Sequence, residues 1–190
     1  AVGLLKMDLL GLRNLTILEE AIRLVKETRG EDCNLRQIPL DNQDVYRLIS
    51  SGETTGIFQL ESSGMRRYIK DLKPTTIFDL QAMVALYRPG PMANIPEFIR
   101  RKHNPSLIKY PDPRLADILK ESYGVITFQD DVLLTAIKVA GYSWLEADKL
   151  RKAIGKKITA EMKKQHDKFV EGCVANGMKR HKAEEFWILF

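Results

Sequence analysis

The sequence predicts a mainly α-helical protein that begins with a short β/α segment. Along most of the 190 residues, apolar residues recur three and four positions apart. Capping residues and glycine or proline stops divide this pattern into helices of ordinary length. Only the first few residues alternate in the manner of a strand. The hydrophobic share of 44% is enough for a sizeable core, so wholesale disorder is excluded.

Residues 4–8 are expected to form a strand with one polar face. Leu5 and Met7 would share one side, and Lys6 and Asp8 the other. A carboxylate on a strand face is a usual mount for a divalent metal in phosphoryl transfer, and a lysine beside it could hold a phosphate oxygen. An exposed ion pair at a sheet edge would have the same pattern.

Capping residues predict a series of helices in the first half of the chain. They run from about Asn14 to Gly30, Asp41 to Gly52, Ser62 or Ser63 to Pro74 and Thr76 to Tyr87. Residues 56–60 are expected to be extended. Thr76 and Asp79 resemble a capping box, with Asp in place of the usual Glu. A Pro-Gly-Pro turn then ends the last of these helices, because proline cannot continue it.

The second half is expected to be helical as well. Helices are predicted over residues 97–102, 112–124 and 132–140, from an S-x-x-E capping box at Ser143, and from about Thr159 to Gly177. The stretch 125–128 between two of them is expected to be a short strand or an extended link. No internal repeat interrupts this order.

Positive charge is concentrated near the end of the chain. The formal net charge is +5, and residues 145–182 hold eleven basic against five acidic residues. A stripe of lysines at helical spacing and two flanking cations lie in this stretch: Lys149, Lys152 and Lys156, with Arg151 and Lys157 beside them. Binding to nucleic acid or to a nucleoside triphosphate would need such a surface, although a solvated helix face has a similar composition.

Other polar clusters have simpler explanations. Arg88 and residues 100–103 flank the Pro-Gly-Pro turn, which could aim a guanidinium at a phosphate or base. Cations favoured at a helix C-terminus would give the same pattern. Adjacent Asp130 and Asp131 are interpreted as favouring the N-terminus of the next helix rather than as metal ligands.

Several classes of protein are excluded by composition. The apolar stretches are shorter than the roughly 20 residues that a membrane span needs, and no secretory signal opens the chain, so a soluble cytoplasmic protein is expected. Cys33 and Cys173 are far apart and without zinc-site spacing, which indicates reduced thiols. The missing initiator Met and the apolar last residues suggest a fragment of a longer protein.

Seven segments resemble, in order, the landmarks of one family: KMDLLGLRNLTIL, TTGIFQLESSGMRRYIKDLKP, ALYRPGPM, IPEFIRRKH, ESYGVITFQDDVL, AGYSWLEADKLRKAIGKK and KFVEGCVANGM. They are similar to the alpha subunits of bacterial DNA polymerase III, the family C replicative polymerases. The resemblance covers essentially the whole chain. It implies that residues 1–35 end the palm, which is similar to the nucleotidyltransferase fold of polymerase beta, and that residues 36–190 form most of the helical fingers.

The resemblance also implies a role for the first polar residues. Asp8 matches the family's third catalytic aspartate, a magnesium ligand, and Lys6 matches a lysine near the incoming nucleotide. The other two aspartates belong to a Pro-Asp-x-Asp motif that does not occur in this chain. A two-metal magnesium site would therefore need residues from elsewhere in a parent protein.

In the fingers, LRKAIGKK matches a family segment with paired basic residues that contact the triphosphate. Arg151 and Lys152 take these positions, and Lys156 and Lys157 close the segment. A lysine at position 152 supplies charge but not the bidentate fork of the arginine that the family has there. Arg88 lies in a landmark near the active cleft. FQDDVL departs from the family pattern and is assigned no chemical role.

The function that the resemblance implies is template-directed DNA synthesis, in which a primer 3′-hydroxyl attacks the α-phosphate of a dNTP with two magnesium ions. Primer–template DNA and dNTP would be ligands. A sliding clamp, an exonuclease subunit and a clamp loader would be partners of the full-length parent, and this chain alone would be inactive. The alternative is a non-catalytic helical module that binds nucleic acid through its basic C-terminal helices.

Overall fold

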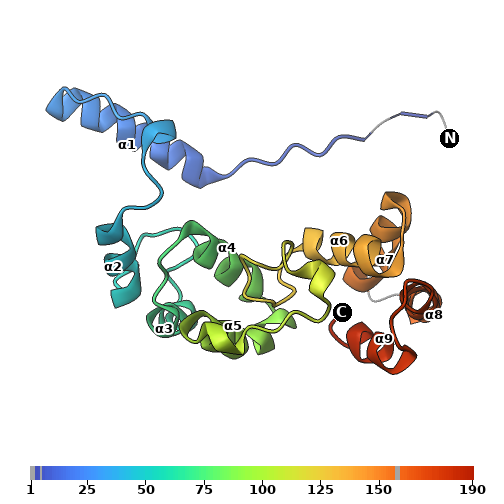
Figure 1. The fold of residues 1–190 in the computed structure, drawn as a ribbon. Coiled ribbons are helices and arrows are strands. Elements are labelled where there is room, and N and C mark those ends of the chain that lie inside the picture. The colour runs from blue at the N-terminus through green and yellow to red at the C-terminus, as the bar shows by residue number, and fades with distance from the viewer. Residues whose placement is uncertain (1–2, 5, 157–158) are drawn as a thin grey trace.

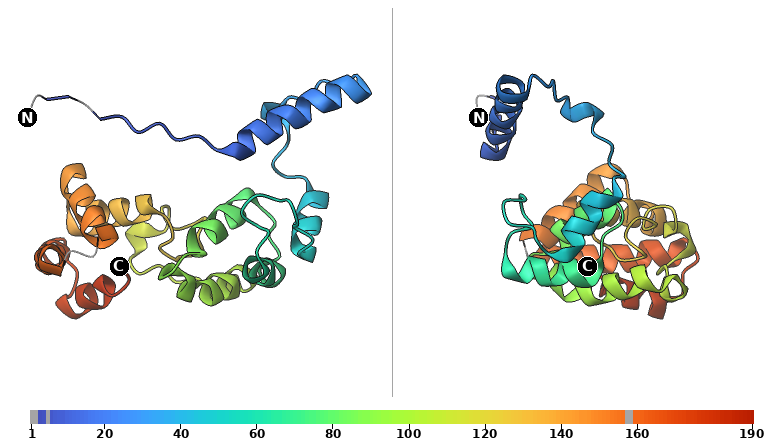
Figure 2. Two further views of the ribbon diagram at one scale, coloured as in Figure 1. Left: turned by 180° about the vertical axis from the view of Figure 1, so that it is seen from behind. Right: turned by 90° about the vertical axis from the view of Figure 1, so that its left-hand side faces the viewer.

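The computed structural model describes residues 3–4, 6–156 and 159–190. The regular elements of these ranges are nine α-helices and four short 3₁₀ helices. Figure 1 shows an N-terminal arm and α1 (Arg13–Arg29) lying apart from a helical body formed by the later helices, and both views in Figure 2 show the same separation. None of the residues of α1 is buried. No helix within these ranges is long and apolar enough to cross a membrane.

The predicted N-terminal strand is wrong. Residues 3–4 and 6–12 have no regular secondary structure, and Leu5 lies outside the described residues. Met7, expected on an apolar face, is 75% exposed. A strand needs a neighbour for its backbone hydrogen bonds, and the described part of the chain contains no strand that could supply one. The helix of the predicted β/α segment is present as α1, and it ends at Gly30 as expected, but it begins without a side-chain cap.

The first half of the body contains four helices and three short 3₁₀ turns. The helices are α2 (Gln43–Ser51), α3 (Ser63–Leu72), α4 (Ile77–Leu86) and α5 (Ile95–His103), and the turns are η1 (Leu35–Gln37), η2 (Pro91–Asn94) and η3 (Pro105–Leu107). The predicted caps at Ser62 and Thr76 are confirmed. At α2 the cap is Asn42 instead of Asp41, because the Asn42 side chain accepts hydrogen bonds from the N–H groups of Asp44 and Val45 in the first turn.

Two further predictions in this region are wrong. Residues 56–60 form turns instead of an extended segment, and the helix predicted over residues 112–124 is reduced to η4 (Pro113–Leu115) followed by turns. The irregular path is stabilised by tertiary hydrogen bonds: Arg101 Nη1 donates to the carbonyls of Lys109 and Tyr123, each at 3.2 Å. Residues 125–128 form the expected link, with no strand.

The second half of the body packs four helices around an aromatic core. They are α6 (Gln129–Ala140), α7 (Trp144–Lys156), α8 (Thr159–Ala175) and α9 (Arg180–Trp187). Phe169 and Phe186 lie at the centre of this core. The segment between α5 and α6 joins the two halves, because Leu119 is buried in this core while Val125 is buried in the core of α3, α4 and α5.

Candidate functional site

Helix α7 presents the predicted stripe of lysines to solvent. Its opposite face is buried through Ala147, Leu150 and Ala153, so the lysines, which are three, four and seven residues apart, lie outward. The exposed members are Lys149, Lys152 and Lys156. The predicted capping box is confirmed: Ser143 N donates to Glu146 Oε2 at 2.9 Å, and Glu146 N donates to Ser143 Oγ at 3.4 Å. Burial and capping therefore fix which face of α7 carries the charge.

Asp148 holds the two predicted phosphate-contacting cations together. Its Oδ1 accepts from Arg151 Nη2 at 2.8 Å and Nε at 3.1 Å, and its Oδ2 lies 2.6 Å from Lys152 Nζ. The hydrogen bond from Lys152, and then that from Arg151, lower the pKa of Asp148. Gln129, at the start of α6, accepts from Arg151 Nη1 at 3.4 Å. The structure thus brings Arg151 and Lys152 to one carboxylate.

The remaining predicted cations are dispersed. Lys156 lies on the same exposed face of α7 as Lys152, whereas Lys157 falls outside the described residues. Arg88 is exposed in the turn between α4 and η2. Within the ranges described, no hydrogen bond or ion pair joins the Arg88 side chain to those of α7. A contribution of Arg88 to the same site is therefore a prediction from the sequence only.

The N-terminal pair lies on the irregular arm. Lys6 Nζ is 3.5 Å from Asp8 Oδ1, and the two side chains are 87% and 73% exposed. Where the chain is described, no group of three or more potential ligands could hold a metal ion. Asp8 offers a hard oxygen of the kind that Mg²⁺ prefers, but one exposed carboxylate does not form a magnesium site. The described residues alone do not fit such a site.

The basic run at residues 100–103 has a structural role. Lys102 is buried and ion-paired with Asp79 of α4, Arg101 Nε donates to Glu97 Oε1 at 2.7 Å, and His103 Nε2 lies 2.8 Å from the carbonyl oxygen of Asp71. The contacts of Lys102 and His103 join α5 to α4 and α3, whereas the pair of Arg101 and Glu97 lies within α5. Sequence reasoning missed the buried pair, because nothing in a run of four basic residues distinguishes the one that turns inward.

Asp79 is the centre of a buried network. Its Oδ2 accepts from Lys102 Nζ at 2.8 Å and from the Thr75 amide at 2.9 Å, and its Oδ1 accepts from Tyr123 Oη at 2.7 Å. Burial raises the pKa of Asp79, but the hydrogen bonds from Lys102, Thr75 and Tyr123 outweigh it, and the net effect is a lowered pKa. Burial and the nearby carboxylate raise the pKa of the Tyr123 phenol.

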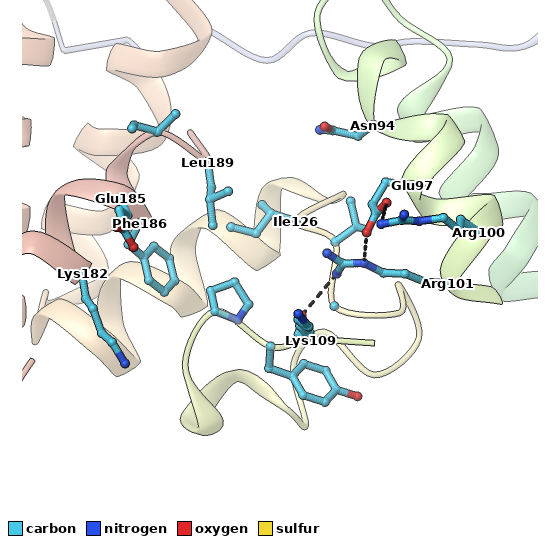
Figure 3. Close-up of a pocket in the computed structure, with 15 residues that line it drawn as sticks. Asn94, Glu97, Arg100, Arg101, Lys109, Ile126, Lys182, Glu185, Phe186 and Leu189 are labelled. Carbon is cyan, nitrogen blue, oxygen red and sulfur yellow. Dashed lines mark hydrogen bonds and ion pairs between the residues drawn. The ribbon is translucent and has the colours of Figure 1, made fainter. Parts of the chain in front are cut away.

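A second feature missed from the sequence is a cavity of about 630 Å³ between α5 and α9, shown in Figure 3. Arg100, Arg101, Lys109 and Lys182 line it together with apolar side chains such as Phe186. The dashed lines in Figure 3 mark the ion pairs of Glu97 with Arg100 and Arg101, and the hydrogen bond of Arg101 to Lys109. Arg100 and Arg101 belong to the basic run beside the Pro-Gly-Pro turn, whereas Lys6, Asp8, Arg88, Arg151, Lys152 and Lys156 do not line this cavity.

A helical body that presents paired cations on one exposed helix is the type of domain that can bind a polyanionic ligand. Comparison with known proteins identifies the family more closely. The model of the bacterial DNA polymerase III alpha subunit finger domain matches residues 14–177, and the chain belongs to this family.

The curated relatives are much longer than this chain. DNA polymerase III subunit alpha of Halalkalibacterium halodurans is 47% identical over 99% of the chain and 17% of that protein. The proteins of the same name from Aquifex aeolicus and Thermus aquaticus are 46% and 45% identical, each over 98% of the chain and 16% of the relative. The chain therefore spans about a sixth of the length of these relatives.

Proposed function

We propose that this chain forms most of the fingers and the end of the palm of a DNA-directed DNA polymerase. In this proposal, the enzyme transfers nucleotides from dNTPs to a primer 3′-hydroxyl on a DNA template, and α7 binds the triphosphate of the incoming dNTP. The observation that carries the proposal is the pairing of Arg151 and Lys152 on an exposed face of α7, in a chain of the fingers family.

The charges of α7 suit a triphosphate. A guanidinium can make two parallel hydrogen bonds to phosphate oxygens, and an ammonium adds a compact point charge. Arg151 would supply the first and Lys152 the second, while Lys156 lies on the same exposed face. Cations that are already in place when negative charge develops on the leaving pyrophosphate stabilise the transition state without reorganisation. Lys157, next in sequence, is included in the proposal on sequence alone.

We place the boundary between palm and fingers near residue 35. The separation of α1 from the body and the absence of buried residues in α1 support this division. Within the palm part, Asp8 is proposed as one magnesium ligand and Lys6 as a residue near the nucleotide. Further carboxylates, from other parts of the polymerase, would be required for a magnesium site.

The wider setting follows from the same proposal. The complete polymerase would act in the bacterial cytoplasm on primer–template DNA. Sliding clamp, exonuclease subunit and clamp loader would be its partners. Base pairing with the template, rather than side chains that read bases, would select the nucleotide, so the DNA-facing surface needs positive charge and not a base-reading motif.

Single-nucleotide incorporation by the whole polymerase tests the proposal. Arg151→Ala should raise the KM for dNTP or lower kcat, whereas Lys164→Ala, which removes an exposed cation from α8, should leave both unchanged. Identical kinetics for the two variants would contradict the assignment of α7. Salt-dependent binding of primed DNA without any incorporation would instead support a non-catalytic nucleic-acid-binding module, for which the exposed lysines of α7 would be sufficient.

A further inference from the structure

We propose that Asp148 is a positioning residue that orients Arg151 and Lys152 toward the triphosphate. The inference rests on the function proposed above and adds a residue to it. Asp148 itself carries the wrong charge to contact a phosphate, so its role would be exercised through the two cations.

The Asp148 carboxylate contacts Arg151 through one oxygen and Lys152 through the other. Arg151 follows it by three residues and Lys152 by four, the two spacings that place side chains on the same helix face. Arg151 uses Nε and Nη2 for Asp148 and directs Nη1 to Gln129 on α6. Contacts from two helices therefore restrict the guanidinium, and part of its hydrogen-bonding edge stays available to a ligand.

Exposure supports a site that is ordered yet accessible. The side chains of Asp148 and Arg151 are 34% and 31% exposed, and that of Lys152 is 58% exposed. Long cationic side chains lose conformational entropy when a ligand immobilises them. A carboxylate that restricts them beforehand reduces this loss, and one negative charge against two positive charges leaves a net attraction for phosphate.

A purely structural role for Asp148 is a poor explanation. Helix α7 is already anchored by buried Ala147, Leu150 and Ala153 and begins with a complete capping box. Partly exposed ion pairs within one helix contribute little to stability. Asp148 could instead compete with the triphosphate for the two cations. In that case it would weaken dNTP binding, and its removal would lower the KM for dNTP.

The experiment is single-nucleotide incorporation by the whole polymerase carrying Asp148→Asn. The KM for dNTP should rise about fivefold to tenfold, because binding would then have to immobilise two long cationic side chains that Asp148 no longer restricts, while kcat changes less than twofold. Glu171→Gln is the matched control, because it removes a carboxylate from an exposed ion pair with Arg180 and leaves α7 untouched. An unchanged or lowered KM for Asp148→Asn would overturn the inference.

Two more variants separate positioning from folding. Asp148→Glu retains the carboxylate and should restore most of the KM. In the Arg151→Ala polymerase, adding Asp148→Asn should raise the KM less than it does in the unmodified enzyme, because its effect passes partly through Arg151. Full additivity, or no rescue by glutamate, would contradict positioning even if Asp148→Asn also lowered the unfolding temperature.

The two proposals fail in different ways. If Arg151→Ala leaves the dNTP kinetics unchanged, or if the unmodified polymerase incorporates no nucleotide, the proposed function of α7 is wrong, and the inference is overturned with it. If Arg151→Ala raises the KM and Asp148→Asn does not, only the positioning role is wrong.

Discussion

Lys102 Nζ lies 2.8 Å from Asp79 Oδ2 inside the first half of the body, where the two side chains are 8% and 0% exposed. The pair joins the C-terminal end of α5 to the first turn of α4, across 23 residues of sequence. The same carboxylate closes the capping box of α4, so one residue serves both the helix start and the tertiary contact. The ion pair therefore holds α4 and α5 together in the first half of the body, which precedes the cationic helix α7.

Lys102→Met should destabilise the protein strongly. The substitution keeps an apolar stem but leaves Asp79 buried without its cation, and breaking a buried pair from one side costs about 3–5 kcal/mol. Arg100→Met is the control, since the Arg100 side chain is 62% exposed in its pair with Glu97. Denaturant unfolding measures both. If the free energy of unfolding falls equally and only slightly in both variants, the buried pair does not stabilise the protein more than the exposed pair does.

His166 should make stability depend on pH. It lies between Asp167 at 2.9 Å and Glu184 of α9 at 2.7 Å, with its ring against Trp187. The hydrogen bonds to Asp167 and then Glu184 raise its pKa above 6.5. The pKa of His166 is therefore higher in the folded protein than in the unfolded protein. Protonated His166 stabilises the fold fully at a pH below its pKa in the unfolded protein, and this contribution is lost as the pH rises through its pKa in the folded protein.

The measurement for His166 is the free energy of unfolding at pH 6 and pH 8. The unmodified protein should lose stability between these values through this site, and His166→Gln should lose less. If the free energy of unfolding changes by the same amount in both proteins, His166 does not cause the pH dependence.

Replacing each of two helical glycines by alanine should change the stability of the protein in opposite directions. A Cβ on Gly172 of α8 would lie 2.2 Å from the carbonyl oxygen of Ala140, whereas a Cβ on Gly155 of α7 would meet nothing within 4 Å. Gly172→Ala should therefore cost about 1–3 kcal/mol by overpacking, and Gly155→Ala should add about 0.5–1 kcal/mol of helix propensity. Thermal unfolding tests both, and destabilisation by Gly155→Ala would contradict the open surroundings of α7.

Asp8→Ala should abolish nucleotide incorporation by the whole polymerase without changing its unfolding temperature. The side chain is 73% exposed and paired only with Lys6 among the described residues, so its removal leaves no buried group unsatisfied. Circular dichroism melting controls for folding. Normal incorporation by the variant would eliminate the proposed metal ligand.

Local interactions explain what could be predicted from the sequence. The capped starts at Ser62, Thr76 and Ser143 depend on residues three positions apart, and the outward stripe of α7 depends on periodicity within one helix. Neither requires knowledge of the tertiary fold. The same rules located the cations that the proposed function uses, although they did not single out Asp148.

Long-range interactions explain the rest. The turns that replace the predicted helix near residue 120 accept hydrogen bonds from Arg101, which no local pattern reveals. Lys102 finds its partner only because α5 packs near the start of α4. The N-terminal segment has a strand-like alternation, but alternation forms a strand only where a neighbouring strand pairs with it.

The most direct test of the central claim is affinity labelling of the whole polymerase with a dNTP that carries a lysine-reactive group on its terminal phosphate. Peptide mapping after reaction with primed DNA present should find the label on Lys152 or Lys156, and excess unmodified dNTP should suppress it. Labelling confined to lysines outside α7, or labelling that excess dNTP leaves unchanged, would contradict the claim that α7 binds the incoming triphosphate.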